Sequence, residues 1–430
     1  MKRWTLILAL GVIGCGDPDP SKTKPAAPES NDPAFTATSL DAWYLIGNAA
    51  TPGHDEMVFS ITAPGDTSYV DAYIADLAPV RMTKQGASFA LDASIKELPS
   101  GTYDVLFSAN GSATAFARFT WNRSAPYYVL VSTDYDFSEM GDNSITFMNN
   151  LHAAHKDLRI THFWAPYTYT DPAVSEARRT VMTSWLQTQH DTFNDEVALH
   201  IHPYCNFVTD AGLTCITDQS SVYPTGDPTG YTIKVAAYDR SSVGVLFDHA
   251  RALFAAHNLP APVTFRAGGW TANAATLQAL NDKGFIADSS ALNWARIEEW
   301  KGYNLYDWNM AEWLPINDTT QPYYPSSSDI VENQPGSDLA LLEAPVNGVM
   351  MDYIDADQIK TLFSENWDGS PLASPHVLMS GYHPSVMTLP MYTNRLNQLC
   401  QLADANLASA GLGPVVYITL QDLVPVFPEQ

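Results

Sequence analysis

Two histidines one residue apart could bind a metal ion together. They are His200 and His202, in the stretch Glu196–Tyr204, whose apolar residues alternate in the period-two pattern of a β-strand. Side chains two apart on a strand face the same side, ~7 Å apart, so both imidazoles can reach one divalent ion. Pro203 ends the strand because it has no N–H for the ladder. With 11 histidines in 430 residues, a chance pair is a real alternative, and a metal site needs further ligands at neighbouring strand ends.

Other predicted strands also end in side chains that could take part in catalysis or metal binding. One strand ends in Ser-Thr-Asp-Tyr-Asp, and because side chains alternate along a strand, Asp134 and Asp136 point to the same side. Arg266 and Asp288 are each the last residue of a predicted strand, and His383 comes just after another. Each has a simpler interpretation, since a strand-end Asp often caps a helix, an Arg often forms a structural ion pair, and a lone His often lies in the core. The gathering of all these residues at strand ends favours one shared site.

The elements that must position these residues alternate between strand and helix from residue 125 onward. We predict strands at 127–132, 158–164, 196–201, 262–266, 285–288, 339–343, 377–381 and 415–420, and helices at 145–155, 173–189, 241–258, 274–283 and 392–409. Regular alternation over ~300 residues predicts a parallel sheet, most simply a distorted (β/α)7-type barrel at 125–430. Chemistry in such barrels collects at the C-terminal ends of the strands.

Residues 36–124 have a different pattern. Short alternating segments are separated by Pro, Gly, Asn and Asp at hairpin spacing, and no helical period is visible. The sequence Pro-Ser-Gly-Thr-Tyr at 99–103 leads into a strand as in the late hairpin of an immunoglobulin-like sandwich. We therefore expect a small all-β immunoglobulin-like domain before the α/β barrel. A spacer is favoured over a carbohydrate-binding role because no row of aromatic residues is evident.

The N-terminus carries a targeting signal. Lys2 and Arg3 precede a short apolar run that ends in Ile-Gly-Cys, and this pattern at residues 1–15 resembles the bacterial lipoprotein signal peptide with its lipobox. Cys15 would then be lipidated; an ordinary secretion signal with a chance cysteine is the alternative. Residues 16–35 are rich in proline and read as a tether. The expected location is a bacterial envelope membrane, the outer membrane, facing the periplasm or the cell surface.

The net charge bears on the binding partners of the protein, and the cysteine content bears on its disulfides. With 22 basic and 47 acidic residues, the net charge of −25 argues against nucleic acid as a partner. In an oxidising compartment, Cys205 and Cys215 can close a small loop by a disulfide, which is favoured over a zinc thiolate because no second close cysteine pair exists. Cys400 lies in an apolar helical pattern and reads as a core residue.

Five motifs in order carry a resemblance to a known family. They are Thr-Asp-Tyr-Asp at 133–136, His-Ile-His at 200–202, Phe-Arg-Ala-Gly-Gly-Trp at 265–270, Asp-Ser-Ser at 288–290 and Gly-Tyr-His-Pro at 381–384. Over residues 125–425 the chain resembles the polysaccharide deacetylase family (carbohydrate esterase family four, with a NodB-like homology domain). The resemblance implies a distorted barrel, a divalent metal, usually Zn²⁺, and removal of acetyl groups from N- or O-acetylated oligo- or polysaccharides.

The resemblance also implies roles for the residues at these motifs. Metal ligation falls to Asp136, His200 and His202, and catalysis to Asp134 as base, Arg266 as the residue that holds this base, His383 as general acid and Asp288 as the partner of this acid. Substrate contacts fall to Trp270, Tyr382 and Tyr135. The sequence departs from the family where Tyr135 separates the two aspartates, where the histidines are only two apart, and where Ser289 replaces a tryptophan.

Two other functions fit parts of the pattern. A glycoside hydrolase on the same barrel would pair Asp134 or Asp136 with Glu343 and would need no metal. A lipid-anchored glycan-binding protein would bind metal or sugar without turnover. The aromatic-rich segment Asn293–Gln334 falls over the same rim and suits either sugar faces or a buried lid.

Overall fold

The computed structural model describes residue 27 and residues 40–331 and 339–429. The predicted lipidation site Cys15 lies outside these residues, as does the predicted tether except for Ala27. By internal contacts, the described chain divides into two units. The first contains Val58–Ala93 and Tyr103–Thr120, and the second contains Leu40–Met57, Ser94–Thr102 and the chain from Trp121 onward.

The regular elements between residues 40 and 124 are all strands. They are β1(Trp43–Leu45), β2(Glu56–Thr62), β3(Val70–Ile74), β4(Val80–Arg81), β5(Thr83–Gln85), β6(Ser88–Ser94), β7(Gly101–Ala109) and β8(Ala117–Ser124). One sheet has the order β8-β7-β3-β4, with β1 parallel to the end of β8, and the other has the order β2-β6-β5. In β2, every second residue is buried, which is the alternation that the sequence predicts. The immunoglobulin-like class of this region stays a prediction.

A parallel sheet forms the centre of the second unit, which is a mixed α/β structure with a half-barrel of parallel strands. Its order is β14-β13-β12-β11-β10-β9-β15, and β16 pairs with the first residues of β9. The strands are β9(Tyr127–Asp134), β10(Ile160–Trp164), β11(Glu196–Ile201), β12(Thr264–Ala267), β13(Ala287–Asp288), β14(Leu342–Glu343), β15(His376–Tyr382) and β16(Val415–Tyr417). Every residue of β9 is buried, as expected of a strand covered on both faces.

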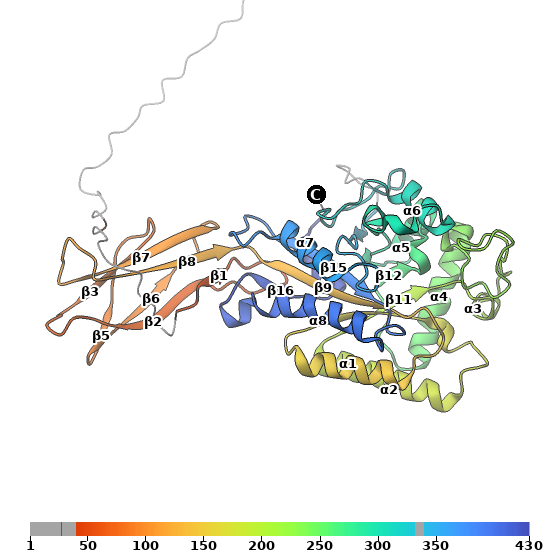
Figure 1. Cartoon of the computed structure of the whole chain (residues 1–430), viewed down its shortest axis with the longest axis horizontal. Helices are drawn as coiled ribbons and strands as arrows, with labels where there is room; N and C mark the ends of the chain where they lie inside the picture. The colour runs from red at the N-terminus through yellow and green to blue at the C-terminus, as the bar shows by residue number, and fades with distance from the viewer. Residues whose placement is uncertain (1–26, 28–39, 332–338, 430) are drawn as a thin grey trace, which may run out of the picture. The chain divides into compact units, whose positions relative to one another are not determined.

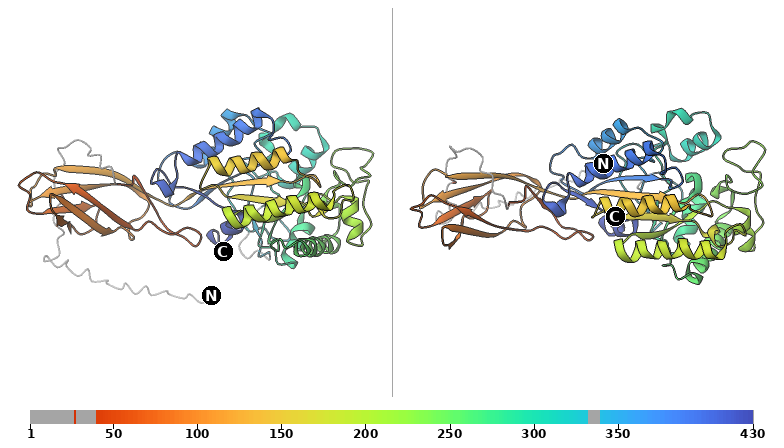
Figure 2. Two further views of the ribbon diagram at one scale, coloured as in Figure 1. Left: turned by 90° about the horizontal axis from the view of Figure 1, so that it is seen from below. Right: turned by 60° about the horizontal axis from the view of Figure 1, so that its bottom comes forward.

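Helices surround these strands (Figure 1). They are α1(Asp142–Ala154), α2(Glu176–Phe193), α3(Cys205–Asp210), α4(Arg240–Ala256), α5(Ala274–Asp282), α6(Asn304–Trp313), α7(Ala356–Asn366), α8(Pro390–Asp404) and α9(Leu420–Leu423). Helices α1 and α8 lie side by side in both Figures 1 and 2, and His155, which follows α1, bonds Asp404 at the end of α8 at 2.6 Å. Among the described residues, no helix has the length and apolarity that a bilayer crossing requires.

A connecting segment fills the space between the two edge strands β14 and β15. Residues 346–351 donate backbone hydrogen bonds to both sides: Val346 N bonds Ala291 O at 2.7 Å, Gly348 N bonds Met379 O at 2.8 Å, and Met351 N bonds Gly381 O at 2.7 Å. The segment therefore stands where another barrel strand would lie, and it brings the following turn to the rim that carries the site.

The predicted strands at 285–288, 339–343 and 415–420 are shorter in the structure. Strand β13 stops at Asp288 because the next carbonyl, that of Ser289, accepts a hydrogen bond from Arg266 Nε at 3.0 Å instead of extending the ladder. Strand β16 ends at Tyr417, and α9 begins at Leu420.

Candidate metal centre and acid–base site

The strand ends bring most of the predicted site residues around one hollow, which we call the site cavity. It has a volume of about 200 Å³, and its lining includes Asp134, Asp136, His202, Trp270 and His383. His200 and Arg266 are buried directly behind this lining, where each contacts one of the aspartates. The residues come from the C-terminal ends of β9, β11, β12 and β15, as the barrel prediction requires.

Asp136, His200 and His202 form a three-residue cluster that could hold a metal ion. One ligand atom from each lies within 4.8 Å of the others. Asp136 Oδ1 is 3.4 Å from His200 Nε2 and 3.3 Å from His202 Nε2. Nitrogen and carboxylate oxygen ligands of this kind suit Zn²⁺ and related divalent ions.

Hydrogen bonds on the far side of each imidazole show that the cluster fits a cation. His200 Nδ1 lies 3.0 Å from the Arg266 carbonyl and His202 Nδ1 lies 2.8 Å from the Tyr231 carbonyl. Because a carbonyl only accepts, each Nδ1 must carry a proton, and in the neutral form of each ring Nε2 then presents a lone pair. Two lone pairs and a carboxylate oxygen then face one another, an arrangement that a bound cation stabilises and that is typical of metal-ligating histidines.

Gly268 allows the His202 ring to lie where it does. A Cβ at position 268 would stand 2.6–2.7 Å from three atoms of that ring, a separation that real Cβ atoms essentially never show. The glycine in the Phe-Arg-Ala-Gly-Gly-Trp motif therefore has a direct role in placing a predicted metal ligand.

Asp134 is bound to Arg266, as the resemblance implies. Arg266 NH1 donates to Asp134 Oδ1 at 2.5 Å and to Ser132 Oγ at 3.0 Å, and NH2 donates to Ser289 Oγ at 3.0 Å. The guanidinium is fully buried and lies over the Phe163 ring at 4.1 Å. A buried guanidinium held from several sides fixes the position of the carboxylate and compensates its negative charge.

The structure corrects the partner of His383. His383 Nδ1 bonds Asp352 Oδ2 at 2.7 Å, whereas Asp288 accepts from Ser290 Oγ at 2.8 Å and contacts other groups. Burial alone would lower the pKa of His383, but the carboxylates of Asp352 and Asp136 together raise this pKa to about 10. His383 Nε2 is 3.7 Å from Asp136 Oδ2. The bond to Asp352 therefore favours the protonated imidazole, which can donate a proton at the site cavity.

Asp288 instead pairs with Glu343, its neighbour across the β13–β14 ladder. Both carboxyls are fully buried, and burial raises the pKa of Asp288 to about 6 and the pKa of Glu343 well above its usual range. Glu343 Oε1 accepts from the Ala291 backbone N at 3.0 Å, and Glu343 does not line the site cavity. This placement disfavours the glycoside hydrolase alternative, which needs Glu343 to reach the substrate opposite Asp134 or Asp136.

Of the three predicted substrate contacts, only Trp270 reaches the site cavity. Tyr382 is fully buried, and its ring packs edge-on against Phe147 at 6.2 Å. Tyr135 is also buried, with its hydroxyl 2.9 Å from His162 Nδ1. The alternation along the extended chain explains both corrections, because each tyrosine neighbours a site residue and therefore points to the opposite face.

Three residues that line the site cavity or contact its lining were not predicted. Asp352 holds His383, Tyr231 donates its hydroxyl to Asp136 Oδ2 at 3.0 Å, and the Tyr353 ring lies 5.7 Å from the His383 ring. All three lie in irregular loops, where neither period nor spacing relates a residue to a strand end. The only local signal is the position of Asp352 and Tyr353 just before a helix start.

The structure joins Cys205 and Cys215 by a disulfide with a Cα–Cα distance of 5.1 Å. Cys205 is the first residue of α3, three residues after His202. The bridge therefore closes the loop that follows β11, the strand of the two candidate metal-ligating histidines. Cys400 is a buried free cysteine.

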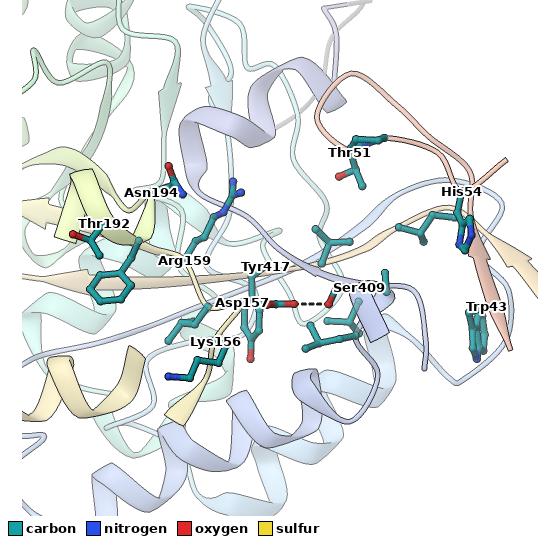
Figure 3. A pocket seen from close by; sticks show the side chains of 18 residues that line it. Trp43, Thr51, His54, Lys156, Asp157, Arg159, Thr192, Asn194, Ser409 and Tyr417 are labelled. Carbon is teal, nitrogen blue, oxygen red and sulfur yellow. Dashed lines mark hydrogen bonds between the residues drawn. The ribbon is translucent and has the colours of Figure 1, made fainter. Parts of the chain in front are cut away.

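A larger hollow of about 500 Å³ lies at the opposite, N-terminal ends of the strands (Figure 3). Lys156 and Arg159 precede β10, and Asn194 precedes β11. Asp157 accepts a hydrogen bond from Ser409 across this hollow (Figure 3). It contains none of the predicted site residues, so size alone does not identify the site.

No family model matches the sequence, and no curated protein is significantly similar to it. Among solved structures, the chain is similar to a Mycobacterium smegmatis protein assigned to the polysaccharide deacetylases, with 13% identity, a TM-score of 0.42, and coverage of 70% of this chain and 89% of that one. It is also similar to a family 4 carbohydrate esterase from Streptomyces lividans in complex with acetate, with 10% identity, a TM-score of 0.33, and coverage of 70% of this chain and 95% of that one. An allantoinase is similar with 12% identity, a TM-score of 0.38, and coverage of 70% and 88%. At these identities and TM-scores, the likenesses assign neither activity nor substrate to this chain.

Proposed function

We propose that this protein is a metal-dependent hydrolase that removes acetyl groups from a glycan. The observation that carries the proposal is the convergence of Asp136, His200 and His202, with protons fixed on the far side of both imidazoles. A carboxylate held by an arginine and an imidazole held by a second carboxylate line the same cavity. Base, acid and cation site in one cavity are the parts that hydrolysis of an amide or ester requires.

The residues divide the proton transfers between them. A divalent ion, when bound, polarises an acyl carbonyl and lowers the pKa of water. Asp134, oriented by Arg266, accepts a proton from the attacking water as the new C–O bond forms. His383, held as a cation by Asp352, donates its proton to the leaving amine or alkoxide as the bond to the acyl carbon breaks. The products are acetate and the free amine or hydroxyl of the sugar.

Metal analysis combined with acetate release tests this proposal. Purified protein should contain about one Zn²⁺ or similar ion per chain, and His200→Ala should lose that ion because it removes one of three ligands. Asp134→Asn should keep the ion but lower acetate release ~10²–10⁴-fold, the usual cost of a missing general base. If both variants retain metal and full activity, the proposal is wrong.

The alternative functions predict different results in the same experiment. A glycan-binding protein would bind metal or sugar, and Asp134→Asn would change no rate because none exists. A glycoside hydrolase would release reducing sugar ends instead of acetate, and metal removal would not affect it.

The remaining expectations extend the proposal to location. The Ile-Gly-Cys after the apolar run supports lipid attachment at Cys15 to a bacterial envelope membrane, with the all-β region as an immunoglobulin-like spacer. Mass spectrometry of protein from membranes should find a diacylglyceryl group on Cys15. An unmodified N-terminus would refute lipid attachment and leave the hydrolase proposal untouched.

A further inference from the structure

A second hollow opens from the site cavity, and we call it the outer cavity. Its volume is about 530 Å³, within the range of ligand pockets. Ser221, Val222, Trp300 and Leu305 line both cavities, and the outer cavity adds Glu299, Tyr303 and Asn304. A ligand that fills the site cavity can therefore continue into the outer cavity.

Aromatic rings form a continuous series from the general acid to the outer cavity. The Tyr353 ring lies 5.7 Å from the His383 ring and 4.7 Å from the Trp300 ring. Tyr303 follows Trp300 by three residues and is 66% exposed. Of the eight aromatic residues in the segment 293–331, four are core, namely Trp294, Tyr306, Trp313 and Tyr323, and three are partly buried. The exposure of Tyr303 is thus an exception that packing does not explain.

The wall that carries Trp300 and Tyr303 is fixed to the site. Tyr303 N donates to the Trp300 carbonyl at 3.0 Å, which closes a tight turn before α6. Asn309 of α6 donates to the Gly269 carbonyl at 3.0 Å, and Trp313 donates to the Trp270 carbonyl at 3.2 Å. The outer cavity is therefore preorganised relative to the loop beside the metal ligands, which lowers the entropy cost of binding.

The composition of the two cavities points to the chemistry of the ligand. Aromatic faces beside short polar groups suit a sugar ring, which has apolar faces and a hydroxyl edge. Among the described residues, no lysine or arginine lines either cavity, and the outer cavity carries the carboxylate of Glu299. An anionic sugar such as a uronate would find no cationic partner there.

We infer that the outer cavity is a binding subsite for an uncharged sugar unit next to the acetylated one, so that the substrate is an oligomer and not a monosaccharide. This inference rests on the proposed deacetylase function. Tyr303 and Trp300 stack on the ring of the neighbouring unit, and Glu299 and Asn304 accept or donate hydrogen bonds at its hydroxyl edge.

The test uses the full protein with two neutral ligand series, N-acetylglucosamine oligomers and acetylated xylo-oligosaccharides, each of one to four units, and with acetylated galacturonate oligomers as the anionic series. For the neutral series that is a substrate, kcat/KM should rise from one unit to two. Tyr303→Ala should lower the two-unit to one-unit ratio roughly five- to ten-fold, the usual range for an aromatic contact. The galacturonate series should show no such rise.

Tyr223→Ala is the matched control, because Tyr223 is 53% exposed on the facing loop but lines neither cavity. Its ratio should equal that of the wild type. An unchanged ratio in Tyr303→Ala, or an equal loss in Tyr223→Ala, would refute the subsite.

Calorimetric binding of the same oligomers separates this inference from the proposed function. If the wild type releases no acetate, the deacetylase proposal fails. Tighter binding of longer oligomers, lost in Tyr303→Ala, would still support the subsite. No increase of affinity with length in any series would refute it.

Discussion

The contact between Gly268 and His202 gives a sharp test of the proposed metal site. In Gly268→Ala, the new Cβ would lie 2.6 Å from the nearest ring atom of His202, whereas real contacts essentially never fall below 3.0 Å. The ring must therefore retreat by at least 3.0 − 2.6 = 0.4 Å. Metal–ligand distances are held within about 0.2 Å, so this retreat exceeds what the coordination tolerates.

We expect Gly268→Ala to weaken metal binding by at least ~10–100-fold, the loss found when a group that orients a metal ligand is removed. The ring cannot easily retreat by rotation, since His202 Nδ1 is bonded to the Tyr231 carbonyl at 2.8 Å. The assay is competition for Zn²⁺ or Co²⁺ against a chromophoric chelator. Gly65→Ala is the control, because its Cβ would meet no atom within 4 Å, and urea unfolding should show that both variants fold.

A double variant distinguishes the collision from a general disturbance. A His202→Ala background lacks one ligand and should bind Zn²⁺ only weakly, but there Gly268→Ala meets no imidazole, so it should not lower this residual affinity further. Wild-type affinity in Gly268→Ala, or an equal additional loss in both backgrounds, would refute the proposed link between this glycine and the metal ligand.

Three further outcomes are expected. Asp352→Asn should move the alkaline limb of the kcat/KM pH profile to lower pH by roughly one to two pH units. Loss of the carboxylate lowers the raised pKa of His383, and a hydrogen bond to a charged group is worth ~1.5–3 kcal/mol. Asp288→Asn should leave that limb in place, and the reverse result would reinstate Asp288 as the partner of His383. In unfolded, unreduced protein, neither Cys205 nor Cys215 should react with maleimide, and reduction should cost roughly 2–3 kcal/mol of stability for a ten-residue loop, measured by urea unfolding. Chelation of the metal should lower the melting temperature and added Zn²⁺ should restore it, since the ion binds only the folded state; an unchanged melting temperature would argue against a site formed on folding.

Much of the barrel could be predicted because its elements have strong periods. Strands β9, β10, β11 and β15 are apolar runs bounded by turn residues, and each lies within about two residues of its predicted position. The short strands β13 and β14 could not be delimited, since two residues carry no period. Helix α7 was missed, although Asp355 and Gln358 form a capping box whose spacing marks a helix start.

The site was predictable where the side chain belongs to a strand end and not where it belongs to a loop. The alternation of side chains along a strand placed His200 and His202 on the same side, and it also explains why Tyr135 and Tyr382 face away from the site cavity. The partner of His383 was assigned to Asp288 through the resemblance, but Asp288 lies against Glu343. Asp352 reaches His383 only because the segment 346–351 lies along β15, and such tertiary proximity leaves no pattern in the sequence.

That connecting segment has a consequence for local opening of the barrel. Toward β13 it is held by the bond of Val346 N to Ala291 O and a longer one from Asn293 N to Val346 O at 3.4 Å. Toward β15 it is held by three backbone hydrogen bonds, two of which join Val349 and Met351 to Gly381, and by side-chain bonds of Asn347 and Ser380. Amide exchange should therefore begin on the β13 side, and the segment should remain attached to β15 when this seam opens. His383 and its carboxylate would then move as one body, so the proton donor keeps its charge through fluctuations that briefly open the barrel wall.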